Sequence, residues 1–441
     1  MLPRDMSGWL DGYYLLQELA RADLFELLFF LVAFELPRYL LGVAAVLMVT
    51  LRLRLRLGRR GSNPGNPADC PEFTVIVAGH KEARALPKCL DSILEQTVLQ
   101  GPDGRSHAQI IAVDDGSTDR TAAVIAELQH RGRIDVGLSL PVRGGKSAAA
   151  NLALSRCRHE FILVVDADTT FNRDAFAHML APFRDPAVGA VGGNLFVRNP
   201  RASLVTAFQD IEYRISISLG RRTSDSLNLL GIVSGAFGAF RRSALASVGD
   251  FDMEVGEDAD ATMKLRSAGW RITFAPKAWA GTDVPETLTN LVRQRLRWDR
   301  STVTIWARKY AGLMNPFRAN FRLADAMVVW DVLFAQVFLS VGFILYFGWL
   351  LWSLGAMAVA ITGATLIIYL VLASLMLLVQ SYVDDQPEAV RLLPYVPYYI
   401  LLNFVVMRFV RAYSAINEWV FKKSYRDTYV PRHVSREVEN Y

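Results

Sequence analysis

The chain has 441 residues, of which 52% are hydrophobic and 21% charged, and its formal net charge is +5. The mean hydropathy of +0.22 is high for a soluble protein, and the apolar residues gather near the two ends. Three cysteines without CxxC spacing exclude a disulfide framework and a cysteine zinc site. The modest charge, without a basic-aromatic repeat, argues against a nucleic-acid partner. The sequence therefore indicates an integral membrane protein with a water-exposed middle.

The first membrane segment is expected over residues 24–50, because a spanning helix needs about 20 apolar residues. Glu35 and Arg38 interrupt it at i,i+3 spacing, so we expect them to pair on one helix face. The Leu-Arg alternation of residues 51–60 also fits an exposed strand. Next to a span, however, it predicts the positively charged cytoplasmic flank. We therefore assign residues 1–60 to a membrane segment and its flank, and we expect the central domain to face the cytoplasm.

The C-terminal membrane region is expected over residues 323–420, and a basic tail follows at 421–441. Residues 326–352 and 356–380 are strong spanning candidates, and 394–410 is a weaker third. Three spans here and one at the N-terminus would place the basic tail outside, against the positive-inside rule. The alternatives are a re-entrant third segment, an earlier crossing near the N-terminus, or an exception to the rule.

Residues 293–322 connect the middle of the chain to the first of these spans. Trp298, Trp306 and Tyr310 alternate there with several arginines. A basic helix with tryptophans typically lies in the plane of the lipid headgroups, so we expect interfacial amphipathic helices. An ordinary surface helix is the alternative.

Residues 70–292 alternate short apolar runs with helical patterns, which predicts an α/β domain with a parallel-rich sheet. Strands are expected at 73–78, 109–113 and 161–165, and each ends in acidic or polar residues. Open α/β sheets bind ligands outside the carboxyl ends of their strands. This edge of the sheet is therefore the expected site.

Asp166 and Asp168 directly follow the third of these strands. Residues i and i+2 of a strand point to the same side, and two neighbouring buried carboxylates need a compensating cation or donor. A divalent metal that also holds substrate phosphates meets this need. A solvated turn is the alternative, but five strand-like apolar residues before Asp166 favour a metal site.

Four other motifs are ambiguous when each is taken alone. Residues 114–117 (Asp-Asp-Gly-Ser) also fit a turn and a helix cap. Residues 144–147 (Gly-Gly-Lys-Ser) lack the spacing of a phosphate loop, although the lysine can approach a diphosphate. Residues 256–258 (Gly-Glu-Asp) precede an expected helix over 259–268 and also fit helix-dipole partners. Residues 294–298 also fit an amphipathic helix fragment.

Taken together, these motifs resemble those of the membrane-embedded, processive family-2 glycosyltransferases. This group contains hyaluronan, chitin-oligosaccharide, poly-N-acetylglucosamine and bacterial cellulose synthases. The shared elements, in the family's order, are a first strand ending at Glu82, Val113-Asp114-Asp115-Gly116-Ser117, Asp166-Ala167-Asp168, Gly256-Glu257-Asp258 and Gln294-x-x-Arg297-Trp298. The last is the most specific, because it separates polymer-making members from single-transfer relatives. The resemblance implies a GT-A type nucleotide-sugar-binding domain between N- and C-terminal transmembrane helices.

The resemblance also implies a role for each matching residue. The residues that would bind the nucleotide sugar are Glu82, Asp114, Asp115, Lys146, Asp166, Gln294 and Arg297. Asp168, together with Asp166, would bind Mg²⁺ or Mn²⁺. Asp258 would be the general base, and the acceptor sugar would contact Trp298, Gly235 and Glu257.

The implied function is a membrane polysaccharide synthase at a bacterial-type inner membrane. It would transfer sugar from UDP-N-acetylglucosamine or UDP-glucose to a growing β-linked polymer with inversion. Asp331 and Gln336, polar residues inside an expected span, suggest export through a channel. Its partners would be the donor, the polymer, the lipid bilayer and accessory export subunits. A single-transfer enzyme acting on a polyprenyl phosphate and a non-enzymatic membrane scaffold are the alternatives.

Overall fold

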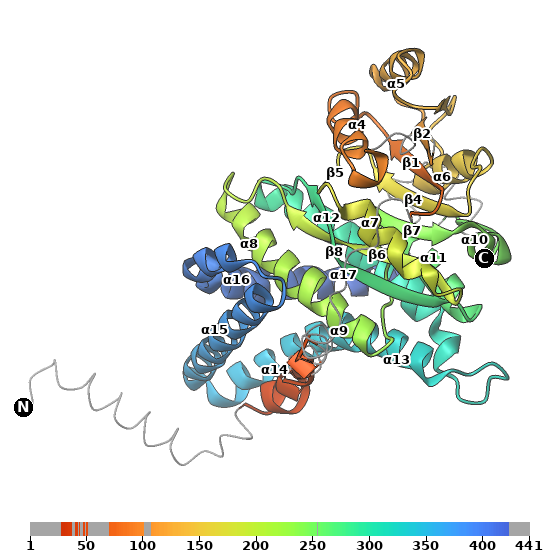
Figure 1. The fold of residues 1–441 in the computed structure, drawn as a ribbon. Coiled ribbons are helices and arrows are strands. Elements are labelled where there is room, and N and C mark those ends of the chain that lie inside the picture. Colours follow the sequence, from red (N-terminus) through yellow and green to blue (C-terminus); the bar gives the residue numbers. More distant parts are fainter. Residues whose placement is uncertain are drawn as a thin grey trace, which may run out of the picture.

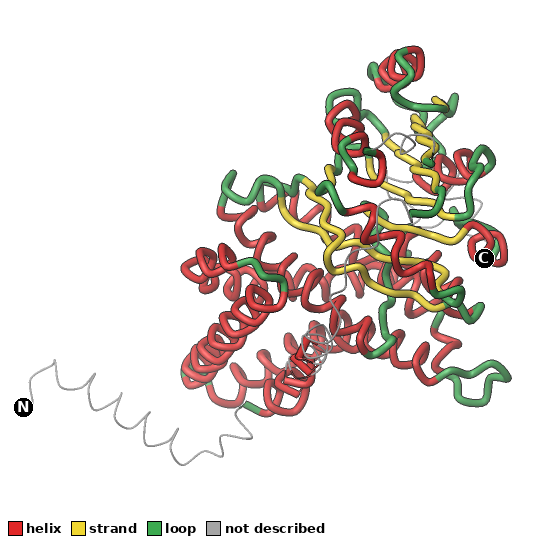
Figure 2. The backbone as a smooth tube through the Cα atoms, viewed as in Figure 1, coloured by secondary structure: helices red, strands yellow, loops and turns green. Residues whose placement is uncertain are grey.

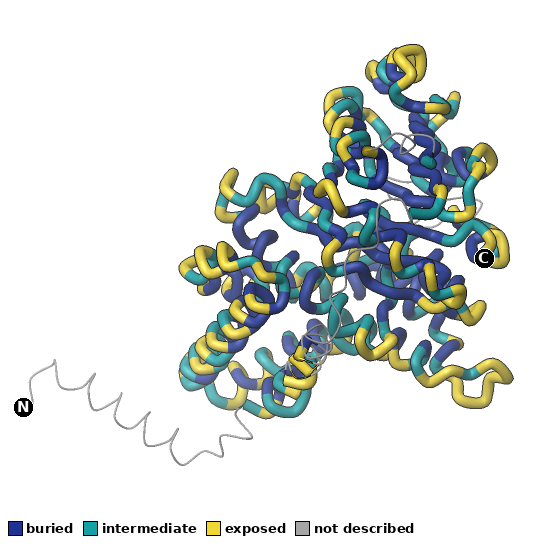
Figure 3. Tube along the Cα trace, viewed as in Figure 1, coloured by how far each residue is buried: buried dark blue, intermediate teal, exposed yellow. Residues whose placement is uncertain are grey.

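The computed structural model describes residues 28–37, 40–42, 44, 47–48, 50–51, 70–100, 107–253 and 255–422. An α/β domain packs against a group of long apolar helices, which lies at the lower left of Figure 1. Figure 2 shows the strands gathered in one twisted sheet with helices on both of its faces. Buried residues follow this sheet, whereas many residues of the long helices are exposed (Figure 3).

The sheet has eight strands in the spatial order β3-β2-β1-β4-β7-β6-β8-β5. The strands are β1 (Phe73–Gly79), β2 (Ala108–Asp114), β3 (Val136–Ser139), β4 (Phe161–Asp166), β5 (Thr170–Phe171), β6 (Val188–Val197), β7 (Phe237–Arg241) and β8 (Arg271–Thr282). Strands β3, β2, β1 and β4 are parallel, β7 runs antiparallel to its two neighbours, and β6 pairs with β8 in parallel. The predicted parallel-rich sheet is therefore confirmed, as are the three predicted strands.

The central strands form because their continuous apolar runs are buried on both faces. Side chains alternate along β1, so Val75 and Val77 join the core on one face while Ile76 and Ala78 join the other. The first core includes side chains of α4 (Leu86–Leu94), α5 (Thr121–His130) and α7 (Ala175–Leu180). The second includes side chains of α6 (Lys146–Leu154), α10 (Arg242–Ser247) and α11 (Glu257–Ser267). This three-layer packing fixes the strand ends that carry the motifs.

Two further groups of helices link the domain to the apolar helices. The first contains α8 (Leu204–Glu212), the π-helical segment Tyr213–Leu219 and α9 (Gly220–Ser226). The second contains α12 (Leu288–Thr302), the π-helical segment Val303–Lys309 and the short helical turn Ala311–Met314.

The segment expected in the headgroup plane is partly buried in protein. Trp306 is 1% exposed and packs with Ala259 and Met263 of α11 and with Val328 of the next helix. Tyr310 is also buried, and its hydroxyl donates to Asp260 at 2.8 Å. Part of the apolar face of this segment therefore contacts the α/β domain and the first long helix.

Three described helices are long and apolar enough to cross a membrane. The first runs over Leu323–Leu354 and contains α13 (Leu323–Val332), the π-helical segment Leu333–Phe338 and α14 (Leu339–Leu354). The second is α15 (Met357–Val383). The third runs over Pro387–Phe421 and contains the 3₁₀ segment Pro387–Tyr395, α16 (Val396–Leu401), the π-helical segment Leu402–Met407 and α17 (Arg408–Phe421). The third helix is continuous from Pro387 to Phe421.

The expected N-terminal span lies partly outside the described residues, and so does Arg38. Residues 29–37 are helical, and Phe30 and Leu31 pack with Phe343 of α14. Among the described residues, Glu35 has partners on two of the long helices. Its carboxylate accepts a hydrogen bond from Arg408 at 2.6 Å and contacts the Tyr369 hydroxyl. The sequence could not reveal this pairing, because Arg408 comes from a helix more than 370 positions away.

Candidate active site

The candidate active site lies at the carboxyl ends of β1, β2 and β4. Gly79 of β1 pairs in register with Asp114 at the end of β2, and Ala78 pairs with Asp166 at the end of β4. The three strand ends are therefore adjacent on one edge of the sheet. This is the edge at which ligands bind in open α/β sheets.

The two carboxylates at the carboxyl end of β2, Asp114 and Asp115, are buried and accept hydrogen bonds from the chain itself. Asp114 accepts hydrogen bonds from the Ser117 amide at 3.1 Å and from the Ser139 hydroxyl at 2.9 Å. Asp115 accepts from the amides of Gly144 and Gly145 at 2.7 and 3.0 Å. These contacts shape the turn after β2 and hold the loop that precedes α6. Contacts of Asp114 and Asp115 with a nucleotide stay a prediction.

Lys146 begins α6 and links two of the predicted motifs. Its ammonium contacts a carboxylate oxygen of Asp166 and donates to the Gly235 carbonyl at 2.7 Å. Gly145 precedes it with a φ of +88°, a conformation that favours glycine. A Cβ at Gly235 would lie 2.8 Å from the Lys146 Nζ, so any side chain at this position would force the ammonium to move.

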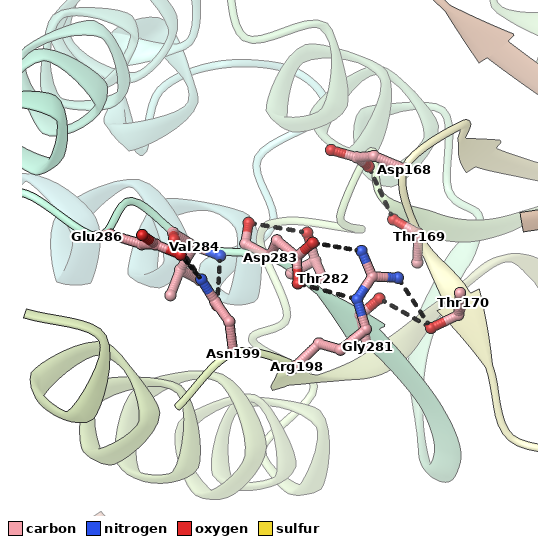
Figure 4. Close-up of polar contacts among 10 residues, drawn as sticks. All are labelled: Asp168, Thr169, Thr170, Arg198, Asn199, Gly281, Thr282, Asp283, Val284 and Glu286. Atoms are coloured by element: carbon pink, nitrogen blue, oxygen red, sulfur yellow. Dashed lines mark hydrogen bonds and ion pairs between the residues drawn. The ribbon is translucent and has the colours of Figure 1, made fainter. Parts of the chain in front are cut away.

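Asp168 lies in the short turn between β4 and β5 (Figure 4). The Thr169 hydroxyl donates to the Asp168 carboxylate at 3.3 Å, and Arg198 donates to the Thr170 hydroxyl at 3.2 Å. Arg198 also donates to both carboxylate oxygens of Asp283, at 2.9 and 2.6 Å. The Arg198–Asp283 pair therefore connects the ends of β6 and β8 to the turn that carries Asp168.

The acids at this edge of the sheet favour a bound cation. Burial and the neighbouring Asp166 raise the pKa of Asp168. Burial, together with Asp168, Asp166 and Asp119, raises the pKa of Glu82 to about 7. Shifts in this direction arise where buried carboxylates lack sufficient positive charge, and a divalent metal would supply that charge.

The residues present fit a metal of the Mg²⁺ or Mn²⁺ type. Within the described part of the chain, no three His, Cys, Asp or Glu side chains form a metal-binding group on their own. Asp166 and Asp168 offer carboxylate oxygens, and substrate phosphates with water would complete the shell. Mg²⁺ is usually held in this way, through one or two carboxylates.

The Gly-Glu-Asp motif begins α11 next to Gly235. The Gly235 amide donates to one carboxylate oxygen of Asp258 at 3.3 Å, and the Ala259 amide donates to the other at 2.8 Å. Burial and Asp258 raise the pKa of Glu257 to about 7, an effect that Lys146 partly offsets. The predicted base and the predicted acceptor-side residues Gly235 and Glu257 are thus brought together.

The Gly-Glu-Asp motif also contacts α12, which carries Gln294, Arg297 and Trp298. Gly256 has a φ of +89°, and a Cβ there would lie 2.9 Å from the Cβ of Ser301. The Ser301 hydroxyl donates to the Trp298 carbonyl at 2.7 Å. The two motifs therefore meet within one turn of α12, and Trp298 keeps 37% of its surface exposed.

Gln294 and Arg297 both lie on α12, at a spacing that places them on one helix face. Both are half-buried. The side-chain oxygen of Gln294 is buried and has no hydrogen-bond partner among the described residues. A buried polar atom without a partner is unfavourable, so it is suited to receive a ligand donor. The predicted contact of both residues with a diphosphate stays a prediction.

Five residues near the site were not identified from the sequence. They are Arg198, Glu212, Arg221, Asp283 and Arg295. The Arg198–Asp283 and Glu212–Arg295 partners are separated by more than 80 positions, so no local spacing indicates them. Arg221 interacts electrostatically with Asp258, which partly offsets the lowering of its pKa by burial. For these five residues, the sequence offered one indication of a role at the site: Arg295 lies inside the motif formed by Gln294, Arg297 and Trp298.

Comparison with known proteins identifies the same domain. The family model described as "glycosyltransferase like family 2" matches residues 71–301. The poly-beta-1,6-N-acetyl-D-glucosamine synthase of Staphylococcus aureus (strain COL) is 30% identical over 248 residues, which cover 56% of this chain and 58% of that protein. The enzyme of the same name from Staphylococcus epidermidis is 32% identical over 228 residues, which cover 51% of this chain and 53% of that protein.

The chain spans just over half the length of the curated relatives that it matches. A solved mannosyltransferase from Pyrobaculum calidifontis, in complex with GDP-Man and Mn²⁺, resembles the chain in fold. The TM-score is 0.51 at 20% identity, and the match covers 86% of this chain and 98% of that one. Because the family model covers more than half of the sequence, this chain belongs to glycosyltransferase family 2.

Proposed function

We propose that this protein is a membrane polysaccharide synthase that transfers N-acetylglucosamine from UDP-N-acetylglucosamine to a growing β-linked polymer. Family membership supports transfer from a nucleotide sugar, and the names of the curated relatives support this sugar and a polymeric product. Three long apolar helices support a membrane location. The catalytic domain would face the cytoplasm, where the UDP-sugar is available, and accessory export subunits would be partners.

One chain of contacts carries this proposal. Asp258 accepts a hydrogen bond from the Gly235 amide, while the Gly235 carbonyl accepts one from Lys146, which also contacts Asp166. A single residue, Gly235, thus joins a carboxylate suited to a general base to a carboxylate suited to a diphosphate-bound metal. Sugar transfer needs these two functions at a fixed separation.

The residue types fit displacement at the anomeric carbon. A sugar hydroxyl is a weak nucleophile, so Asp258 would accept its proton as it attacks. Lys146, Gln294 and Arg297 would bind the diphosphate as negative charge develops on it. A Mg²⁺ or Mn²⁺ ion at Asp166 and Asp168 would neutralise the same charge when bound. One base and one in-line attack imply inversion, so an α-linked donor would give a β-linked product.

A polymer product requires the acceptor to stay bound between additions. Trp298 would stack on the acceptor sugar, with Glu257 and Gly235 lining the same side. Within the first long helix, Gln336 accepts a hydrogen bond from Thr302 of α12 at 3.0 Å, so a polar contact continues from α12 into the bundle. This contact supports a path for the product between the long helices and coupling of synthesis to export.

The test is incorporation of labelled sugar by membranes that contain the protein, with Mn²⁺ or Mg²⁺ present. We expect a long product from UDP-N-acetylglucosamine, little from UDP-glucose, and none from Asp258→Asn. The exposed Asp91→Asn is the matched control and should behave as wild type. Label confined to a small organic-extractable lipid would instead identify single transfer to a polyprenyl phosphate. Unimpaired synthesis by Asp258→Asn would refute the assignment of the base.

Export coupling needs a separate measurement in sealed inverted vesicles. If synthesis is coupled to export, new polymer enters the lumen and resists an added glycosidase until detergent opens the vesicles. Complete digestion without detergent would show that the product stays on the side of synthesis.

A further inference from the structure

Trp298 is held from one side by a charged residue of its own helix. The guanidinium carbon of Arg295 lies 4.3 Å from the centroid of the Trp298 ring, well within the range of a cation–π contact. Arg295 also donates to a carboxylate oxygen of Glu212, the last residue of α8, at 2.5 Å. Glu212, Arg295 and Trp298 therefore form one continuous contact from α8 to the surface of α12.

The ion pair beneath the ring is buried, whereas the ring is not. The side chains of Arg295 and Glu212 are 10% and 12% exposed, while Trp298 is 37% exposed. Since a buried charge is unfavourable without its partner, Glu212 confines the guanidinium to one position. The planar guanidinium then covers part of the ring, and the exposed part of the indole is held in one orientation.

We infer that Glu212 and Arg295 are positioning residues that set the orientation of Trp298 for the acceptor sugar. The inference rests on the proposed role of Trp298 as the acceptor platform. An aromatic ring binds a sugar through its face, so the angle of the ring decides where the acceptor hydroxyl lies. That angle matters here because the turn of α12 after Trp298 contacts Gly256, two residues before Asp258.

The test compares variants of Glu212 and Arg295 with a matched variant on α8, the helix that carries Glu212. Glu212→Gln removes the charge of the partner, and Arg295→Lys keeps the positive charge but loses the planar group. Asp210→Asn breaks a similar pair, in which Arg214 donates to Asp210 at 3.0 Å, two residues from Glu212. The purified full chain is assayed with UDP-N-acetylglucosamine, Mn²⁺ and a β-1,6-linked N-acetylglucosamine pentamer as acceptor. Both KM values, kcat and product length are measured.

We expect Glu212→Gln and Arg295→Lys to raise the KM for the pentamer about 10-fold and to shorten the product. The KM for the donor should stay within about 2-fold of wild type, and Asp210→Asn should change neither value. If Glu212→Gln does not fold, the double variant Glu212→Gln, Arg295→Gln removes both buried charges together. It should fold and still show the raised acceptor KM.

Three results would overturn the inference, and they differ in what they say about the proposed function. If Trp298→Ala raises the acceptor KM but the Glu212 and Arg295 variants do not, the ion pair does not position the ring. If Trp298→Ala itself leaves the acceptor KM unchanged, the platform role of Trp298 fails, and the inference fails with it. Equal changes in the donor and acceptor KM values would indicate a general structural effect and would also refute a positioning role.

Discussion

At the scale of single residues, Gly235 connects the two halves of the site through its backbone. A methyl group at this position would displace the Lys146 ammonium from Asp166 and from the Gly235 carbonyl. Loss of one electrostatic contact to a developing charge typically lowers turnover about 10²–10³-fold. We therefore expect Gly235→Ala to lower kcat by about 10²-fold without unfolding the protein. Gly363→Ala, at a glycine of α15 with open space around it and without a positive φ, is the control for an added methyl group.

Glu82 gives the stability of the protein a specific pH dependence. Its pKa is about 7 in the folded chain and near 4.5 ordinarily, so the folded state binds this proton more tightly. The stability from this group is present at low pH and is lost as the pH rises through 7. Between pH 5 and 8, Tm should fall in the wild type and fall less in Glu82→Gln. The exposed Glu127→Gln should follow the wild type, and an identical slope for Glu82→Gln would contradict the prediction.

Arg198 should affect metal binding without touching the metal. Its contacts with Asp283 and the Thr170 hydroxyl hold the turn that carries Asp168 (Figure 4). Changes in such outer contacts typically weaken metal affinity 10–100-fold. Arg198→Gln should therefore weaken Mn²⁺ binding about 10-fold or more. The electron paramagnetic resonance signal of free Mn²⁺ measures this affinity. Arg271→Gln, in a comparably exposed pair with Asp185, should leave the affinity unchanged.

The sequence predicted the chemical types of the site residues better than their contacts. Asp166 and Asp168 could be placed at a strand end because a short apolar run directly precedes them. By contrast, the contact of Asp115 with the loop before Lys146 joins residues about 30 positions apart. Only the fold brings such partners together, so a single sequence without the structure could not reveal them.

At the scale of secondary-structure elements, the apolar patterns of the sequence were sufficient to predict the sheet but not the environment of the segment that follows α12. The strands at 73–78, 109–113 and 161–165 are buried on both faces. A short continuous apolar run also fits a buried helix segment, but runs this short, bounded by turn residues, favour strands. The segment after α12 carries an apolar face that fits either lipid or protein. Trp306 and Tyr310 were expected near lipid, and the structure buries them against α11 and α13 because those helices present a matching apolar surface.

At the scale of the whole molecule, a buried ion pair joins the catalytic domain to the first long helix. Arg266 of α11 and Asp325 of α13 are 3.0 Å apart, and their side chains are 2% and 3% exposed. Removing one partner of such a pair typically costs about 3–5 kcal/mol. Asp325→Asn should therefore lower the free energy of unfolding by about that amount. Asp185→Asn, which breaks an exposed pair, should lower it by less than about 1 kcal/mol. Unfolding by denaturant in mixed micelles would measure both.

The placement of α11 between these contacts has a mechanical consequence. The helix has 11 residues and is therefore about 16 Å long, with Asp258 in its first turn and Arg266 in its last. Its first turn packs against α12 and its last turn against α13, so it connects the first long helix to the proposed base, Asp258. If the first long helix spans the membrane, a change of its tilt in thicker or thinner lipid would shift the proposed catalytic carboxylate of Asp258. Turnover should accordingly vary with the length of the lipid acyl chains. The thickness of the membrane would then influence the rate of sugar addition.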